Sequence, residues 1–385
     1  MTDPTLPIEL WPIAANTGWG LFGMGLALGL ARQGRRVILP PSDPTGIPLT
    51  VKPTLGAMMQ PIAPDTERIA IRPYGLHWPK YIETPHARQV LIYMAEDTAV
   101  PDHALTEIRK YELVLAPSRW AQGQIAKHDI PSTLWWQGFD ESLFYPAPRK
   151  RPADGPLYVF CGGKLEFRKG QDIVVEAFKR FRETPEGKEA ILVTAWHNHW
   201  VQTMASIWES GYVKGVPIVR NGVMDIPAWL EANGLPREAN IDLGLISQAE
   251  MAQAIRECDV AIFPNRCECA TNLVLPEAMA CGVPCIVGNW AGQADVVETC
   301  GGIPLLQSTP VTLPCPIYNG YDGWGEANVQ ECVDKLCHFS QVREQQGPER
   351  LRATVGAYDA DAARTHFGWT PRSIALTAIL DEHFN

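Results

Sequence analysis

Residues 263–284 read FPNRCECATNLVLPEAMACGVP, and this stretch decides the fold. The run that leads into it, Val260–Phe263, is apolar and predicts a buried strand. Residues 278–281 favour or tolerate a helix, and the sequence GVP at 282–284 ends it. A strand, a polar turn and a helix start in succession predict a place where free backbone N–H groups meet a polar ligand.

Strand and helix patterns alternate on both sides of this stretch, which is typical of parallel sheets covered on both faces. The expected strands are residues 8–13, 37–39, 90–93, 113–116, 133–136, 157–161, 190–194, 241–245, 260–263 and 285–288. The expected helices include residues 22–32, 172–182, 248–258 and 371–384. We therefore expect an α/β protein.

A proline-rich segment, residues 145–156, interrupts this alternation and predicts a linker that acts as a hinge. A chain of 385 residues suits two domains better than one core. We expect an N-terminal domain at 1–150 and a C-terminal domain at 156–369. The final helix, within 370–385, is expected to pack back on the first domain.

The composition excludes several classes of protein. A hydrophobic content of 46% with 20% charged residues is that of a globular chain. A net charge of −10 argues against nucleic acid as the main partner, because phosphate backbones select basic surfaces. The basic run at 149–151 is expected to be solvated linker, with a lipid-headgroup contact as the alternative.

The N-terminal region carries no basic signal segment, and the apolar run 21–31 is too short to span a bilayer. We therefore expect a cytoplasmic protein whose ten cysteines are reduced thiols. A zinc site is the alternative for the cysteines at 267, 269, 281 and 285. Their spacing matches no common structural zinc pattern, so buried thiols are expected instead.

The first strand of the second domain runs into GGKLEFRKG, residues 162–170. A glycine such as Gly163 after a parallel strand lets the backbone approach a ligand, and Lys164 and Lys169 can reach the same anion. Two ammonium groups can neutralise a diphosphate without a metal. The alternative is a surface loop with ordinary lysines.

Acidic residues follow the strand at 90–93 in the first domain. Glu96 and Asp97 should lie at the carboxyl edge of the sheet, where ligands bind in open α/β folds, with His103 a little further on. We expect these side chains to face a ligand in that crevice. The alternative is an N-cap cluster for a helix at 104–110.

These blocks resemble the GT4 glycosyltransferases of the GT-B fold. The family's two-glutamate signature ending in E-A-M-A-x-G-x-P corresponds to Glu268, Glu277 and the helix after them, and G-R-L-x-x-x-K-G corresponds to GKLEFRKG. The loop 16–20 resembles the family's first glycine-rich loop, and further blocks stand at 117–120 and 138–146. The resemblance runs from about residue 8 to 370, in order.

The resemblance implies a GT-B enzyme in which two Rossmann-like, doubly wound parallel-sheet domains face a cleft. The C-terminal domain would bind a UDP, GDP or ADP sugar, and the N-terminal domain a hydroxyl acceptor. A hexose would be transferred with retention of anomeric configuration, and the leaving phosphate would help to take the acceptor's proton. Neither a cofactor nor a metal is expected.

The resemblance also implies roles for individual residues. The second glutamate, Glu277, would bind the ribose hydroxyls and the first, Glu268, the transferred sugar, although here eight residues separate them instead of the usual seven. The expected donor-binding residues are Gly18, Gly163, Lys164, Lys169, Glu268, Thr271, Asn272, Leu273 and Glu277. The expected acceptor-binding residues are Trp19, Glu96, Asp97 and His103, and the expected catalytic residues are Lys164, Lys169, Glu268, Glu96 and Asp97.

Other functions stay open at this stage. A sugar-nucleotide epimerase or a pseudo-glycosyltransferase uses the same fold, and a non-catalytic module could have kept only the nucleotide-sugar pocket. The base, the sugar and the acceptor are not determined by the sequence. A peripheral membrane contact stays open too, because a lipid is among the acceptors that remain.

Overall fold

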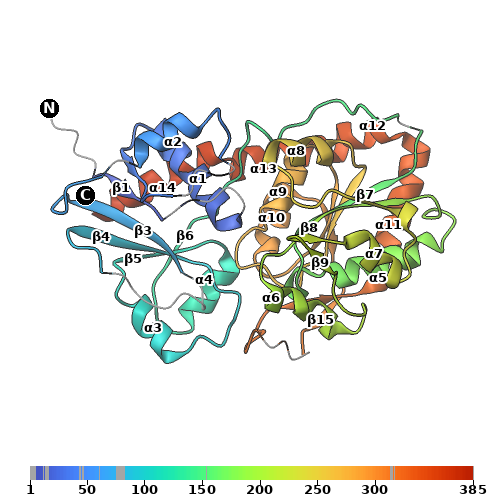
Figure 1. Ribbon diagram of the computed structural model, residues 1–385, viewed down its shortest axis with the longest axis horizontal. Coiled ribbons are helices and arrows are strands. Elements are labelled where there is room, and N and C mark those ends of the chain that lie inside the picture. Colours follow the sequence, from blue (N-terminus) through green and yellow to red (C-terminus); the bar gives the residue numbers. More distant parts are fainter. Residues whose placement is uncertain are drawn as a thin grey trace. The chain divides into compact units, whose positions relative to one another are not determined.

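The chain forms two compact units in the computed structural model, which describes residues 6–11, 13, 17–42, 45, 47–59, 61–74, 83–152, 154–312, 315 and 317–384. Unit 1 comprises residues 1–141 and 365–385, and unit 2 comprises residues 142–364 (Figure 1). The chain therefore crosses between the units twice, before residue 142 and after residue 364. The first crossing lies upstream of the expected linker at 145–156.

Unit 1 contains a six-stranded parallel sheet in the order β2-β1-β3-β4-β5-β6. The strands are β1 (Ile8–Glu9), β2 (Val37–Ile38), β3 (Arg68–Tyr74), β4 (Ala87–Tyr93), β5 (Leu113–Ala116) and β6 (Thr133–Leu134). Buried aliphatic runs such as LVLA in β5 suit a sheet covered on both faces. The strand order reverses between β1 and β3, which is where doubly wound sheets bind ligands.

Strand β3 was not predicted, because its sequence, RIAIRPY, contains two arginines and a proline. The structure compensates both charges with one carboxylate. Arg68 Nε lies 2.6 Å from Glu9 Oε2, and Arg72 pairs with the other oxygen of Glu9. Burial raises the pKa of Glu9, but the two guanidinium groups outweigh it, so the carboxyl pKa lies below its usual value.

The helices of unit 1 cover this sheet, and the C-terminal helix lies beside the first one (Figure 1). They are α1 (Gly18–Arg32), α2 (Lys52–Met58), α3 (Asp102–Ile108), α4 (Arg119–Ala126) and α14 (Trp369–Phe384). The rings of Phe22 and Trp369 stack with centroids 5.5 Å apart, and Trp135 Nε1 donates to the carbonyl of Arg372. The last helix thus packs directly against other parts of unit 1.

Unit 2 contains a second six-stranded parallel sheet, in the order β11-β8-β7-β12-β13-β14. The strands are β7 (Tyr158–Lys164), β8 (Ile191–His197), β11 (Asn240–Asp242), β12 (Val260–Phe263), β13 (Cys285–Gly288) and β14 (Ile303–Leu305). Numbered within the unit, this is the Rossmann order 3-2-1-4-5-6. The order reverses between β7 and β12, so a ligand crevice is expected beyond the carboxyl ends of these two strands.

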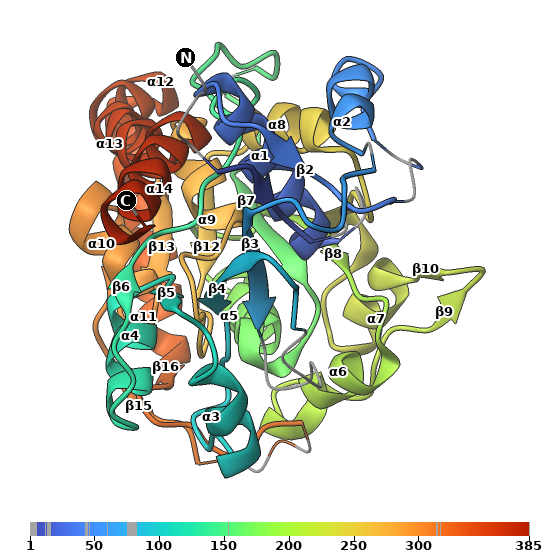
Figure 2. The ribbon, with the colours of Figure 1, turned by 90° about the vertical axis from the view of Figure 1, so that its left-hand side faces the viewer.

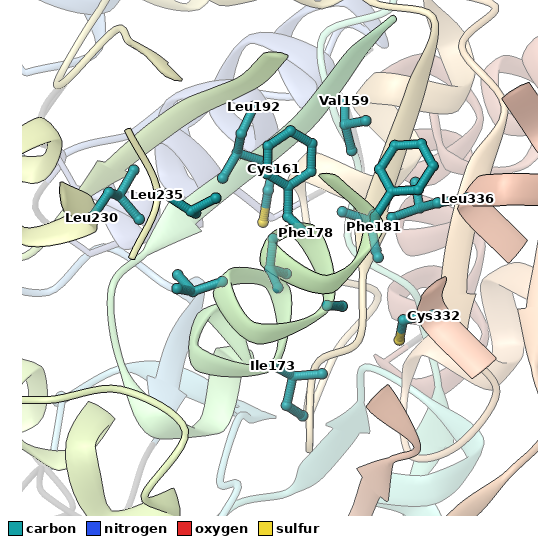
Figure 3. Packing of buried hydrophobic residues seen from close by; sticks show 14 of the residues in the cluster. Val159, Cys161, Ile173, Phe178, Phe181, Leu192, Leu230, Leu235, Cys332 and Leu336 are labelled. Atoms are coloured by element: carbon teal, nitrogen blue, oxygen red, sulfur yellow. The ribbon is translucent and has the colours of Figure 1, made fainter. Parts of the chain in front are cut away.

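Helices pack on both sides of this sheet around one apolar core (Figures 1 and 2). They are α5 (Gln171–Arg182), α6 (Val201–Ala205), α7 (Ile226–Ala232), α8 (Gln248–Arg256), α9 (Val274–Ala280), α10 (Gln293–Cys300), α11 (Val329–Gln346), α12 (Pro348–Leu351) and α13 (Ala357–Phe367), whose last residues belong to unit 1. Phe178 and Phe181 of α5 pack in this core together with Leu192 of β8 and Leu336 of α11 (Figure 3).

Within the described residues of unit 2 there are also two hairpins and four short helical turns. The hairpins are β9–β10 (Val219–Arg220 and Val223–Met224) and β15–β16 (Ser308–Pro310 and Gly325–Ala327). The turns are η1 (Phe167–Lys169), η2 (Ser206–Ser210), η3 (Arg237–Ala239) and η4 (Arg352–Gly356), the last of which is π-helical.

The segment expected to be a solvated linker is fastened to unit 2. Asp259, at the start of β12, accepts from Arg149, from Arg151 Nη2 at 2.6 Å and from Arg343 Nε at 3.2 Å. The Arg149 side chain is 1% exposed. The prediction of a solvated basic run is therefore wrong for Arg149 and Arg151, because an acidic residue distant in sequence neutralises them.

The ten cysteines, all of them described, form no disulfides, and nine of them are buried. Burial raises the thiol pKa to about 12 for Cys161, Cys281, Cys300 and Cys332. In the described part of the chain, no three His, Cys, Asp or Glu side chains are grouped as a metal site would require. Among the same residues, no helix is both long and apolar enough to cross a bilayer.

Candidate functional site

The lysines of GKLEFRKG lie at the carboxyl end of β7, beside the reversal of strand order. Gly163 and Lys164 end β7, and Lys169 ends the turn η1. Gly170 follows with φ of 69°, and a Cβ there would lie 2.5 Å from the carbonyl oxygen of Pro264. Only glycine fits this position, so the loop after β7 and the turn after β12 are packed directly together.

Five charged side chains form a continuous ladder across these two loops. Lys164 Nζ lies 2.9 Å from Glu166 Oε2, and Arg168 Nη2 lies 2.6 Å from Glu166 Oε1. Arg168 Nη1 lies 2.8 Å from Glu268 Oε2, and Lys169 Nζ lies 2.6 Å from Glu268 Oε1. We call Lys164, Glu166, Arg168, Glu268 and Lys169 the charge ladder.

Both carboxylates of the charge ladder are buried and ionised. Burial raises the pKa of Glu268, but Lys169 and Arg168 outweigh it and hold that pKa below its usual value. The same balance, with Arg168, Lys164 and Lys169 as the cations, lowers the pKa of Glu166. Three cations against two carboxylates leave one positive charge in excess within the ladder. This arrangement favours an anionic ligand.

A second buried network of ion pairs, centred on Arg266, connects the two loops to the rest of unit 2. Arg266, whose side chain is fully buried, places Nη2 2.6 Å from Asp172 Oδ2 and also pairs with Glu326 of β16. Its Nη1 donates to the carbonyl oxygen of Phe167 at 2.6 Å. The turn after β12, the start of α5 and the β15–β16 hairpin thus fix the loop that carries Lys169.

The turn between β12 and α9 contains Thr271, Asn272 and Leu273. Within the described residues, Thr271 Oγ1 and Asn272 Nδ2 are buried and have no hydrogen-bond partner. Leaving such groups unpaired costs free energy, so both are candidates to bond a ligand. Leu273 lies half-buried and precedes α9. The turn is held by Gly292, whose N–H donates to the Glu268 carbonyl and whose Cβ would lie 2.1 Å from the Ala270 carbonyl oxygen.

Glu277 lies in the first turn of α9, which begins at Val274, and is 5% exposed. Its backbone N–H donates to the Leu273 carbonyl at 3.2 Å. The end of β8 and the residues after it, 196–200, lie on the other side of β7 from β12. There, burial together with His199 and Lys164 lowers the pKa of His197 to about 4, so this imidazole is neutral at pH 7.

The expected acceptor residues belong to unit 1. Helix α1 begins at Gly18 and not at residue 22, because the Thr17 hydroxyl caps it by accepting from Gly20 N–H at 3.0 Å. Among the residues that the structure describes, none comes within 4 Å of a Cβ placed on Gly18. The Trp19 carbonyl accepts from Trp11 Nε1 at 3.1 Å, and the Trp19 side chain packs on the unit 1 core. Residue 16 of the same predicted loop lies outside the described residues.

Glu96, Asp97 and His103 lie beyond the carboxyl end of β4, one strand along from the reversal. Glu96 is half-buried, Asp97 is 5% exposed and His103 is exposed on α3. Asp97 Oδ1 accepts from Ala99 N–H at 2.9 Å, so it stabilises its own loop. The alternative of an N-cap cluster is wrong, because α3 begins after Pro101 with no side-chain cap.

A separate concave surface of about 410 Å³ lies between α1, β2 and α2 in unit 1. Arg35, Arg36, Met58 and Ile62 are among the residues that line it. The described residues that line it include none of the expected site residues and no cluster of acids or nucleophiles. It therefore does not enter the assignment of function.

Sequence reasoning missed Arg168, Glu166 and the Arg266 network. The signal for the first two is the run E-F-R-K itself, in which an acid and a third cation flank Lys169. No local signal indicates that Arg266 meets Asp172 and Glu326, because these partners are distant in sequence. A buried arginine with two carboxylates could be found only from the fold.

Residues 227–308, from α7 to the start of β15, match a family model described as Glycosyl transferases group 1. A search of curated protein sequences finds no match to this chain. The matched region covers less than half of the chain, and it includes the turn with Glu268 and the helix with Glu277.

Solved structures similar to this chain are glycosyltransferases and related enzymes. Anabaena HepE in complex with UDP is 15% identical with a TM-score of 0.62, over 98% of this chain and 100% of that chain. Sucrose-phosphate synthase from Thermosynechococcus elongatus is 16% identical with a TM-score of 0.64, over 98% and 99%. A glycosyltransferase from Rickettsia africae is 12% identical with a TM-score of 0.65, over the whole of both chains.

At sequence identities of 12–16%, similarity to these solved structures establishes the fold of the chain. The two parallel-sheet α/β units are those of GT-B glycosyltransferase structures, which confirms the fold class expected from the sequence. Over residues 227–308 the likeness extends to sequence, through the glycosyl transferases group 1 model.

Proposed function

We propose that this protein is a retaining glycosyltransferase that moves a hexose from a nucleoside-diphosphate sugar to an acceptor hydroxyl. The observation that carries the proposal is the charge ladder, which places an excess cation at the reversal of strand order in a Rossmann-like unit. The match of residues 227–308 to the group 1 family supports it. UDP is the first donor nucleotide to test, because HepE structures contain UDP and UDP-glucose.

In this proposal Lys164 and Lys169 neutralise the departing diphosphate. Charge that develops in the transition state is stabilised by donors already fixed in place, and the ladder holds both ammonium groups before the donor arrives. Glu268 positions Lys169 through their 2.6 Å contact, in addition to the sugar contact that the resemblance implies. Glu277 binds the ribose, and Thr271 and Asn272 donate to the donor through their unpaired groups.

Unit 1 supplies the acceptor side in this proposal. Glu96 and Asp97 are the candidates to orient the acceptor hydroxyl, and the Asp97 carboxylate also accepts from Ala99 N–H. No described side chain crowds Gly18, so a ligand can approach the start of α1 there. No metal takes part in the proposed chemistry, and a chelator such as EDTA should leave turnover unchanged.

The decisive experiment measures release of nucleoside diphosphate from UDP-, GDP- and ADP-hexoses with and without a panel of hydroxyl acceptors. The proposal is supported if release requires an acceptor and NMR shows that the product keeps the anomeric configuration of the donor sugar. Release without an acceptor, or epimerised sugar nucleotide, favours another enzyme on this fold. Binding without any turnover favours a nucleotide-sugar binding module.

The site assignment is tested by Lys169→Ala and Glu277→Ala, with exposed Lys188→Ala as the matched control. Removal of one donor to the developing charge costs about 3 kcal/mol, or about a hundredfold in kcat. If both site variants turn over like the control, the assignment is wrong even if the enzyme is a glycosyltransferase.

A further inference from the structure

Trp200 is an exposed aromatic side chain at the edge of the charge ladder. It follows β8, which pairs with β7 so that His197 lies opposite Lys164. Trp200 is 48% exposed, whereas Trp196, four residues earlier, is 1% exposed and packs in the core. Lys164 Nζ lies 5.4 Å from the centroid of the Trp200 ring. The exposed ring and the first cation of the ladder are therefore neighbours.

The backbone under Trp200 is held in place by hydrogen bonds to the ladder loop. Asn198 Nδ2 donates to the Leu165 carbonyl at 2.8 Å, and Asn198 Oδ1 accepts from Trp200 N–H at 2.8 Å. Leu165 N–H in turn donates to the His197 carbonyl at 2.9 Å. Because Asn198 bonds both segments, the position of Trp200 is set relative to Lys164 and Glu166.

The surroundings of the ring suit an uncharged aromatic ligand. The His199 and Trp200 rings meet edge to face with centroids 6.0 Å apart, and His197 lies 5.5 Å from His199. The imidazole of His197 is neutral at pH 7, as described above. A flat aromatic surface thus adjoins the cation that the proposed function assigns to a phosphate.

We propose that Trp200 is a stacking platform for the base of the nucleoside diphosphate whose phosphates meet Lys164 and Lys169. This inference rests on the proposed function. A nucleotide offers an anionic end and a flat π-face, and residues 164 and 200 present the matching pair of surfaces side by side. Stacking is tolerant of base identity, so Trp200 contributes affinity for the nucleotide and leaves the choice of base to other contacts.

The test compares binding of UDP and of pyrophosphate by titration calorimetry, using the full chain. Trp200→Ala should weaken UDP binding by about tenfold, which is within the range that one base on one aromatic ring provides. It should change pyrophosphate binding by less than about twofold, because pyrophosphate has no base. Trp200→Phe should retain most of the UDP affinity, since a ring remains.

Trp208→Ala is the matched control, because Trp208 is 54% exposed and its Nε1 donates to Glu209. It should leave both affinities unchanged. Equal weakening of UDP and pyrophosphate in Trp200→Ala would overturn the inference, since the ring would then act through Lys164. Unchanged UDP binding would also overturn it.

Glucose 1-phosphate distinguishes stacking on the base from stacking on the sugar. Weaker binding of glucose 1-phosphate with unchanged UDP affinity would assign the ring to the sugar and overturn the base assignment. If the wild-type protein binds neither UDP nor pyrophosphate, the proposed function itself fails. The two failures are therefore separate outcomes of one experiment.

Discussion

Replacing Glu268 by glutamine should make the protein less stable and its diphosphate binding tighter. The carboxylate lies 2.8 Å from Arg168 Nη1 and 2.6 Å from Lys169 Nζ, and its side chain is 6% exposed. The amide of Glu268→Gln has the same shape and no charge. Two buried cations would then lose a shared counter-ion, while the ladder's excess charge would rise from one to two.

The loss of stability follows from the burial of these pairs. Removal of one partner of a buried ion pair costs about 3–5 kcal/mol, and the retained amide oxygen favours the lower end of that range. For a unit of this size, about 3 kcal/mol corresponds to a fall in Tm of about 6 °C or more.

The gain in affinity follows from the removal of a repulsion. A carboxylate about 6 Å from a bound phosphate charge, at an effective dielectric constant of about 40, opposes binding by about 1.4 kcal/mol. Pyrophosphate should therefore bind Glu268→Gln about tenfold more tightly than wild type. Sugar transfer should still fall, because Lys169 loses the carboxylate that positions it.

Thermal unfolding and pyrophosphate titration calorimetry measure the two effects on the same preparation. Glu344→Gln, an exposed residue on α11, controls for the change in net charge and should alter neither property. Stability within about 1 kcal/mol of wild type would refute the buried pairing. Weaker pyrophosphate binding would refute the view that Glu268 opposes the ligand's charge.

Three further outcomes are expected. Asp259→Asn should lower the free energy of unfolding by about 4 kcal/mol in urea titrations, because three arginines lose their shared carboxylate, and an unchanged midpoint would contradict this. Gly170→Ala should cost about 2 kcal/mol and abolish pyrophosphate binding, since its Cβ would clash with the Pro264 carbonyl; normal binding in calorimetry would show that the loop can relax. The pKa of His197 is about 4 in the folded protein, so the unfolded chain binds its proton more readily. The free energy of unfolding should therefore fall from pH 7 to pH 5, by about 1 kcal/mol after allowance for partial exposure. His197→Asn should remove this part of the pH dependence, as measured by urea titrations.

Most strands of both sheets could be predicted because a buried parallel strand is an uninterrupted apolar run. Strand β5, LVLA, and strand β12, VAIF, occur where the sequence places them. Strand β3 was missed because Arg68 and Arg72 look exposed until Glu9 is seen to neutralise them. Pairing between charges distant in sequence leaves no local pattern to detect.

The same limit applies to the candidate site. Glycine and lysine spacing predicted the loop after β7, since backbone approach and charge are local properties of GKLEFRKG. The partner of Lys169 was not predicted, because Glu268 comes from another loop about a hundred residues later. Arg168 binds the other oxygen of Glu268 across a similar separation in sequence, so this pair was not predicted either.

The reactivity of the cysteine thiols can be used to measure local unfolding of this protein. All ten lie between Cys161 and Cys337, so every thiol belongs to unit 2 and none to unit 1. Nine are buried, and an alkylating reagent can reach such a thiol only when the surrounding structure opens. Pulsed alkylation of the intact chain therefore measures how often the proposed donor-binding half unfolds, without separating it from the other half.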